Sequence, residues 1–234
     1  MNSGNDLGAA PGAGYTGLVS GHQFNIEAIR RALKDFQADF PTINEKLDMK
    51  REDVSDDMVD QIVESYVFLN DLLAKDIDLF TPAGLHSLLE MNHIVLCGID
   101  PDQRLSYYHH ITETRTRFVS RIKPIRKWVV KNMDKSNPWK LATGFYAMIL
   151  SQPQLFIEGN HRTGNTLLNY LLVSKGVPPY IVTPETAVEY LNVSGDIKFT
   201  DKDNTIESAL NLPSHRKRFI KLLKDRTDDR FLEA

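Results

Sequence analysis

Cysteine is nearly absent from this sequence, and so are long apolar runs and any large excess of charge of one sign. A single cysteine, Cys97, lies in an apolar run among 234 residues, so a disulfide framework is excluded and the thiol is expected to be buried and inert. No group of Cys and His residues has the spacing of a zinc site. No apolar stretch reaches the roughly 18 residues of a membrane span, and a formal charge of −3 gives no overall attraction to nucleic acid.

These absences favour a protein with neither a nucleic-acid partner nor a membrane partner. A cytoplasmic location is expected, although a secreted effector delivered without a cleavable signal would have the same composition. With 41% hydrophobic and 25% charged residues, the chain is able to bury one large core. We therefore expect a single helical domain over residues 22–234. It follows a flexible tail over residues 1–21, which hold six of the thirteen glycines and show no helical periodicity.

Apolar residues recur at helical spacing over most of the chain. One apolar face runs over residues 26–36 and another over residues 54–73, where Ser55 is placed to cap the helix start. The segments are helical and no strand-rich repeat is present, so the sequence predicts an all-α fold with at most a minor β-hairpin.

Proline is expected to divide the later helices. Pro124 lies within a periodic segment over residues 107–129 and should kink or break it. Short terminal helices are predicted over residues 184–191, 206–210 and 213–223.

The stretch FIEGNHRTGN, residues 156–165, places a carboxylate, a Gly-Asn turn and an arginine directly before an apolar helix. Gly159 permits a backbone turn that a Cβ forbids, and free N–H groups there would point at an anion. Arg162 would clamp a phosphate with its planar fork of donors, and Glu158 would hold a divalent cation. The stretch therefore predicts a phosphate-binding loop.

Apolar helices are predicted on both sides of this loop. One leads into it over residues 139–149, and the other begins near Thr166. Residues 154–162 are thus expected to form a loop between two central helices. The core around the loop should include Phe145, Ile149, Phe156, Leu167, Leu168 and Leu171.

These residues resemble the Fic (Fic/Doc) family, whose signature is H-x-F-x-(D/E)-G-N-G-R-x-x-R and whose members transfer AMP from ATP to a hydroxyl of a target protein. The resemblance covers about residues 55–192, and the run over residues 85–98 is similar to the helix before the family's target-facing segment. It implies a Fic-like helical bundle, a nucleotide bound at Gly159, Asn160 and Arg162, Mg²⁺ held at Glu158, and a protein target with a Ser, Thr or Tyr hydroxyl.

The sequence departs from the signature at three positions. Gln154 stands where the family has its catalytic histidine, His161 replaces the second glycine, and Asn165 replaces the second arginine. Because a glutamine amide has no titrating lone pair near neutral pH, Gln154 cannot act as the general base that removes the hydroxyl proton. The fold and the nucleotide pocket are therefore expected to carry over better than the chemistry.

A further resemblance concerns regulation. Many Fic proteins carry an inhibitory helix with the pattern (S/T)-x-x-x-E-(G/N), whose glutamate engages the second motif arginine. Residues 65–70 resemble it, with Ser65 and Asn70 at its ends and Leu69 at the glutamate position. Since the second arginine is Asn165 here, an apolar helix face would replace the ionic contact. A chance match of a Ser and an Asn is the alternative.

Charge is unevenly distributed. Residues 104–131 carry eight basic residues against Glu113 alone, whereas residues 44–78 are strongly acidic. One interpretation is that two solvated faces attract each other across the fold. Another is that the basic segment borders the nucleotide pocket or docks an acidic target.

Three classes of function remain open. The first is a Fic-like protein that binds a nucleotide or phosphorylated ligand, with AMP transfer weakened, lost or altered. The second is an active nucleotidyl or phosphate-linked transferase in which His161 serves as a substitute base. The third is an all-α interaction protein without a ligand.

Overall fold

The computed structural model describes residues 22–134 and 137–233, and the expected glycine-rich tail over residues 1–21 lies outside the described residues. The described part is all-α, as the sequence predicts, and contains two isolated β-bridges instead of a hairpin. Its helices are α1 (Ile26–Glu45), α2 (Asp56–Ala74), α3 (Gly84–Cys97), α4 (Pro101–Ser106), α5 (Tyr108–Asn132), α6 (Pro138–Leu150), α7 (Asn160–Val173), α8 (Pro184–Phe199), α9 (Thr205–Arg226) and the short η1 (Asp229–Phe231).

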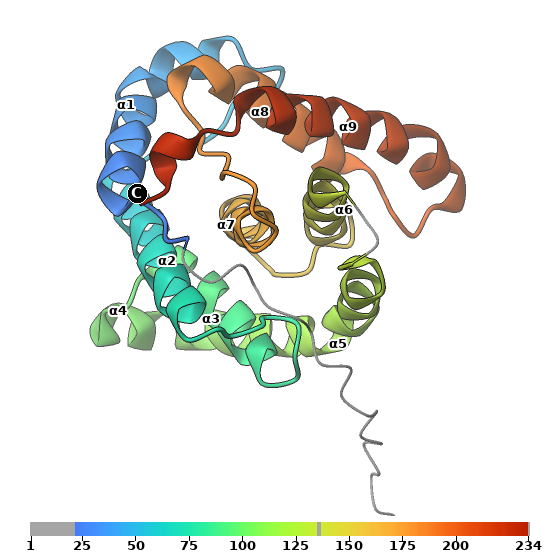
Figure 1. Ribbon diagram of the computed structural model, residues 1–234, viewed down its shortest axis with the longest axis horizontal. Helices are drawn as coiled ribbons and strands as arrows, with labels where there is room; N and C mark the ends of the chain where they lie inside the picture. Colours follow the sequence, from blue (N-terminus) through green and yellow to red (C-terminus); the bar gives the residue numbers. More distant parts are fainter. Residues whose placement is uncertain (1–21, 135–136, 234) are drawn as a thin grey trace, which may run out of the picture.

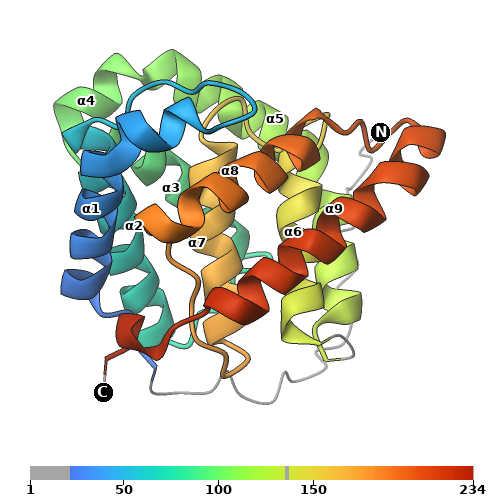
Figure 2. The same cartoon turned by 90° about the horizontal axis from the view of Figure 1, so that it is seen from above.

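Two helices, α6 and α7, occupy the centre of the molecule. Figure 1 looks along both of them and shows the other long helices around them, while α8 and α9 cross in front of them in Figure 2. The two helices differ in composition: α6 is mostly apolar and must be covered on several sides, whereas α7 buries Asn160, Thr163, Thr166 and Asn169 together with its leucines. Eleven of the 14 residues of α7 are buried, against six of the 20 residues of α1, which is amphipathic.

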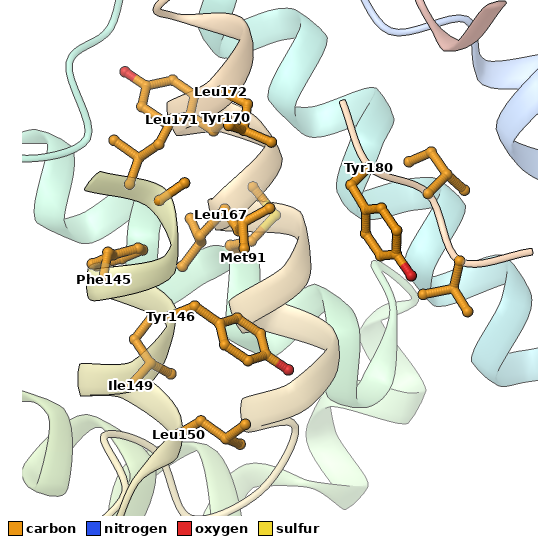
Figure 3. Close-up of a cluster of buried hydrophobic side chains, with 14 of the residues drawn as sticks. Met91, Phe145, Tyr146, Ile149, Leu150, Leu167, Tyr170, Leu171, Leu172 and Tyr180 are labelled. Carbon is orange, nitrogen blue, oxygen red and sulfur yellow. The ribbon is translucent and has the colours of Figure 1, made fainter. Parts of the chain in front are cut away.

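The core forms where α6 and α7 pack side by side. All six residues predicted to surround the loop are fully buried there. Figure 3 shows several of them together with Met91 of α3 and Tyr180 from the segment after α7. Gly164 allows the close approach of the two helices, because a Cβ at this position would lie 3.1 Å from the Tyr146 ring. The central pair therefore holds both ends of the intervening loop rigidly.

Side-chain caps explain several helix starts. The Ser55 side chain accepts a hydrogen bond from the backbone N–H of Met58, as its position predicts, and Asn25 caps α1 in the same way. None of the described helices is long and apolar enough to cross a membrane.

The prediction of a helix break at Pro124 and that of separate helices on the two sides of Pro213 are wrong, whereas a kink at Pro124 stays a prediction. Helix α5 runs unbroken through Pro124, and α9 runs through Pro213, so residues 206–210 and 213–223 form one helix. A proline inside a helix removes one hydrogen bond, but buried Ile122, Ile125 and Val129 anchor α5 on both sides of Pro124. Tertiary packing therefore outweighs the local cost.

Helix α8 is also longer than predicted. It continues beyond residue 191 to Phe199. Polar residues are frequent after residue 191, so the apolar periodicity of α8 is hard to recognise there in the sequence. Val193 and Ile197 are nevertheless buried and extend the apolar face of the helix by another turn.

Candidate phosphate-binding loop

Residues 151–159 form a loop between α6 and α7, so the predicted loop is present between two central helices, but its bounds differ from 154–162 because α7 already begins at Asn160 and not near Thr166. Gly159 has φ +71°, a left-handed conformation, and a Cβ there would lie 3.0 Å from Nδ2 of Asn92. The first helical hydrogen bond of α7 runs from the N–H of Thr163 to the carbonyl of Gly159. The helix itself therefore does not use the N–H groups of residues 160–162, and these are the groups that an anion would engage.

The Asn160 side chain closes the loop on itself. Its Oδ1 accepts from the Phe156 N–H at 2.9 Å, and its Nδ2 donates to the Phe156 carbonyl at 3.0 Å. The Phe156 ring is buried and stacks on Phe118 of α5, with centroids 5.7 Å apart and planes 4° apart. The side chain of Asn160 thus braces the turn, and its backbone N–H is the part left for a ligand.

Neighbouring elements hold the outside of the loop. Asn92 of α3 donates to the Glu158 carbonyl at 3.1 Å and to Oγ1 of Thr163 at 3.0 Å. From α5, Arg117 and Arg121 donate to the carbonyls of Phe156 and Gln154. Two arginines of the basic segment therefore border the loop, whereas a border with a nucleotide pocket stays a prediction.

Lys202 supports the approach to the loop from the other side. Its Nζ donates to the carbonyls of Met148 at 2.7 Å, Ser151 at 3.2 Å and Pro153 at 2.8 Å. Burial lowers the pKa of Lys202 to about 8. Neither Lys202 nor Asn92 is a site residue in the sequence prediction, because contacts to backbone carbonyls leave no sequence pattern.

The acidic and basic segments form no direct ion pair with each other among the described residues, although the charge of Arg104 acts on Glu64 against the burial that raises the pKa of this carboxyl. Among the described residues, the ion pairs of the acidic segment join Asp56 to Lys34, Asp60 to Arg30 and Asp71 to Lys75. Its partners are thus α1 and its own helix instead of α5. In α5, Arg117 and Arg121 lie nearest the loop and donate to its carbonyl oxygens.

Gln154 stands at the position of the family's histidine, and both polar atoms of its side-chain amide have partners in the protein. Its Nε2 donates to the Leu150 carbonyl at 3.1 Å, and its Oε1 lies 3.5 Å from Nδ2 of Asn160. The amide therefore helps to shape the loop.

His161 is turned towards α6, α8 and the segment before α2. Its Nε2 lies 3.4 Å from Nη1 of Arg51 and its Nδ1 lies 3.4 Å from the hydroxyl of Tyr146, which in turn contacts the Tyr190 hydroxyl at 3.0 Å. Burial, reinforced by the charge of Arg51, lowers the pKa of His161 well below 6.5. The ring is thus neutral and takes part in a polar chain inside the protein.

Arg162 extends towards the end of α3. Its Nη1 donates to the Val95 carbonyl at 2.8 Å and lies 3.4 Å from Oε1 of Gln61. Burial lowers the pKa of Arg162, and the charge of Glu158 acts in the opposite direction. In the described part of the chain, the hydrogen bonds of Arg162 use Nη1 alone, so its fork of donors is only partly committed.

Asn165 lies farther along α7, beside α2. The Tyr66 hydroxyl donates to its Oδ1 at 3.4 Å, and its Nδ2 is buried without a partner among the described residues. His161, Arg162 and Asn165 together line a cavity of about 110 Å³. Sites for drug-sized ligands measure about 300 to 1,000 Å³, so this cavity is too small to enclose a nucleotide.

The residues that resemble an inhibitory element lie on α2. Ser65 faces α7, with its Oγ 3.3 Å from Oγ1 of Thr166, and Leu69 is fully buried in the core. Asn70 bonds both the N–H and the carbonyl of Phe24. The helix therefore packs against α7 through buried side chains, and a regulatory role of residues 65–70 stays a prediction.

Glu158 is exposed at the loop surface. In the described ranges, no group of three His, Cys, Asp or Glu residues is able to hold a metal ion. Binding by one carboxylate together with phosphate oxygens is the usual mode for Mg²⁺.

Comparisons with known proteins give one informative match. No model of a protein family matches the chain, and no solved structure does so either. The chain is similar to the protein adenylyltransferase fic-1 of Caenorhabditis elegans, with 30% identity over 138 residues that cover 53% of this chain and 25% of that protein. It thus spans about a quarter of the length of this curated relative. Over about half of its own length, the chain is similar to a Fic adenylyltransferase.

Proposed function

We propose that this protein binds a nucleotide or another phosphorylated ligand at residues 158–162, where the loop enters α7, and that its AMP transfer is very weak or absent. The observation that carries the proposal is the braced left-handed turn at Gly159, which leads directly into the N-terminus of α7. The similarity to a Fic adenylyltransferase supports the same ligand class.

Three features favour an anion at this turn. The N–H groups of residues 160–162 lie at the positive end of the α7 dipole. Arg117 and Arg121 add positive charge from α5. Arg162 retains donors beyond Nη1, so it is able to hold a phosphate while it stays anchored to the Val95 carbonyl.

Glu158 would hold Mg²⁺ that accompanies ATP or another nucleotide. The ion would neutralise phosphate charge and fix the orientation of the phosphates. An exposed carboxylate next to the turn suits this role.

Loss of transfer follows from the absence of a general base. The Gln154 amide accepts a hydrogen bond but cannot take up a proton, and a missing general base lowers the rate by about 10² to 10⁴. His161 does not replace it, because its ring is directed towards Arg51 and Tyr146 inside the protein. A protein target that docks at this loop would therefore be bound without being modified.

Calorimetry tests the binding proposal. The full chain is titrated with ATP, GTP and CDP-choline, each with and without Mg²⁺. We expect at least one to bind, with an affinity that Mg²⁺ raises and that Glu158→Ala makes independent of Mg²⁺. A parent protein that binds none of them would favour the third class of function, a helical interaction protein.

Arg162→Ala isolates the phosphate contact. It should weaken binding by about 1.5 to 3 kcal/mol, the value of a charge-assisted hydrogen bond. Arg104→Ala is the matched control, because Arg104 also binds the end of α3, at the Gly98 carbonyl, but lies outside the loop. Equal loss of affinity in both variants would mean that the end of α3, rather than a phosphate contact, determines binding.

A further inference from the structure

A second and larger cavity lies between α3 and α5, outside the loop over residues 151–159 and the start of α7. Its volume is about 580 Å³, within the range of about 300 to 1,000 Å³ for small-ligand sites. Apolar side chains form most of its wall, among them Phe68 of α2, Leu85 of α3 and Val119 of α5. Val119 is 67% exposed, so the apolar wall is open to solvent.

One wall of this cavity is preformed. Phe118 lines the cavity and is held in place by its stacking on Phe156. A wall that is already fixed lowers the entropic cost of binding.

Two charged side chains, Glu90 and Arg115, line the cavity, and they differ in their partners. Its single carboxylate, Glu90, is paired with Arg104 at 2.7 Å and lies 3.5 Å from Nδ1 of His93. Although burial opposes it, the hydrogen bonds from His93 and Arg104 hold the pKa of Glu90 below its ordinary value. Arg115, by contrast, lines the cavity and has no ion-pair partner in the part of the chain that the structure describes.

We propose that the cavity between α3 and α5 binds a small amphipathic anion, a carboxylate with an aliphatic or aromatic body. The apolar body would lie against Leu85, Phe118 and Val119, and the carboxylate would face Arg115. Charge complementarity decides the class of ligand, because an apolar wall alone would accept any apolar group, whereas the unpaired guanidinium selects an anion.

Octanoate and octylammonium are suitable probes, since they share the apolar chain and differ in the sign of the head group. Binding to the full chain is measured by calorimetry below micelle-forming concentrations. We expect octanoate to bind and octylammonium to bind at least about tenfold more weakly, the value of one charge-assisted contact.

Two variants locate the site. Arg115→Glu should weaken octanoate binding about tenfold or more, and Leu85→Trp should abolish it by filling the cavity. Lys123→Glu is the matched control, because it makes the same change of charge at an exposed position of α5 outside the cavity. Thermal melting of each variant establishes that it is folded.

Several results would overturn the proposal. These are no octanoate binding by the parent, equal binding of octylammonium, or a loss in Lys123→Glu as large as that in Arg115→Glu. A further test uses an acidic peptide with a single leucine. If this peptide binds the cavity and octanoate does not, the partner is a protein and not a small molecule.

Discussion

At the scale of the residue, Gly159 shows how one backbone conformation sets the site. Gly159→Ala should destabilise the protein by more than the roughly 1 to 2 kcal/mol of a left-handed alanine, because its Cβ would also lie 3.0 Å from Asn92. Gly176→Ala is the control, since Gly176 has φ +69° and a Cβ there meets nothing within 4 Å. Urea unfolding should show the larger loss for Gly159→Ala, and equal losses would show that crowding against Asn92 is negligible.

His161 makes stability depend on pH. Because burial lowers its pKa well below 6.5, below that pH the unfolded chain takes up a proton that the folded protein does not. The free energy of unfolding should therefore fall as the pH falls, by at most about 1.4 kcal/mol per pH unit from this residue. His161→Gln should make this decline shallower in urea titrations at successive pH values, and an unchanged decline would contradict the role of His161.

Gln154 decides whether the chemistry is recoverable. Gln154→His should produce self- or target-modification from labelled ATP, because the substitution restores a group that titrates near neutral pH. Robust transfer by the parent that survives Gln154→Ala but is lost in His161→Ala would identify His161 as the base instead. Failure of Gln154→His despite measured ATP binding would show that His161 and Asn165 have adapted the pocket to a different ligand.

At the scale of the element, Lys202 supports the end of α6. Lys202→Met keeps the length and apolar stem of the side chain but removes three hydrogen bonds to carbonyls. Each buried carbonyl left without a donor costs about 1 to 3 kcal/mol unless water replaces the lysine, so unfolding should occur at lower urea concentration. Lys217→Met, at an exposed position of α9, should have little effect, and a comparable loss there would argue against this role.

The sequence predicts the central elements well and their surroundings less well. The loop between two apolar helices follows from the dense apolar spacing on both sides of Gly159, and the six buried core residues follow from the same pattern. The breaks expected at Pro124 and Pro213 are absent. The expectation rests on the hydrogen bond that a proline removes locally, whereas packing against the rest of the fold preserves each helix. Asn92 and Lys202 could not be predicted, since their partners are carbonyl oxygens brought near by folding.

The direction of side chains at the site is likewise invisible in the sequence. His161 and Arg162 are neighbours in the chain, yet one contacts Tyr146 of α6 and the other the Val95 carbonyl of α3. Successive positions on a helix differ by about 100°, so the two side chains enter different surroundings.

At the scale of the whole molecule, the enclosure of α6 and α7 predicts which amide hydrogens exchange last. Amides of helices that open only when the whole protein unfolds exchange most slowly, whereas covering helices exchange through smaller local openings. Because other helices surround α6 and α7 (Figure 1), their amides should be the most protected. The loop that they hold should keep its shape until global unfolding, so a ligand bound there would raise the melting temperature of the entire fold.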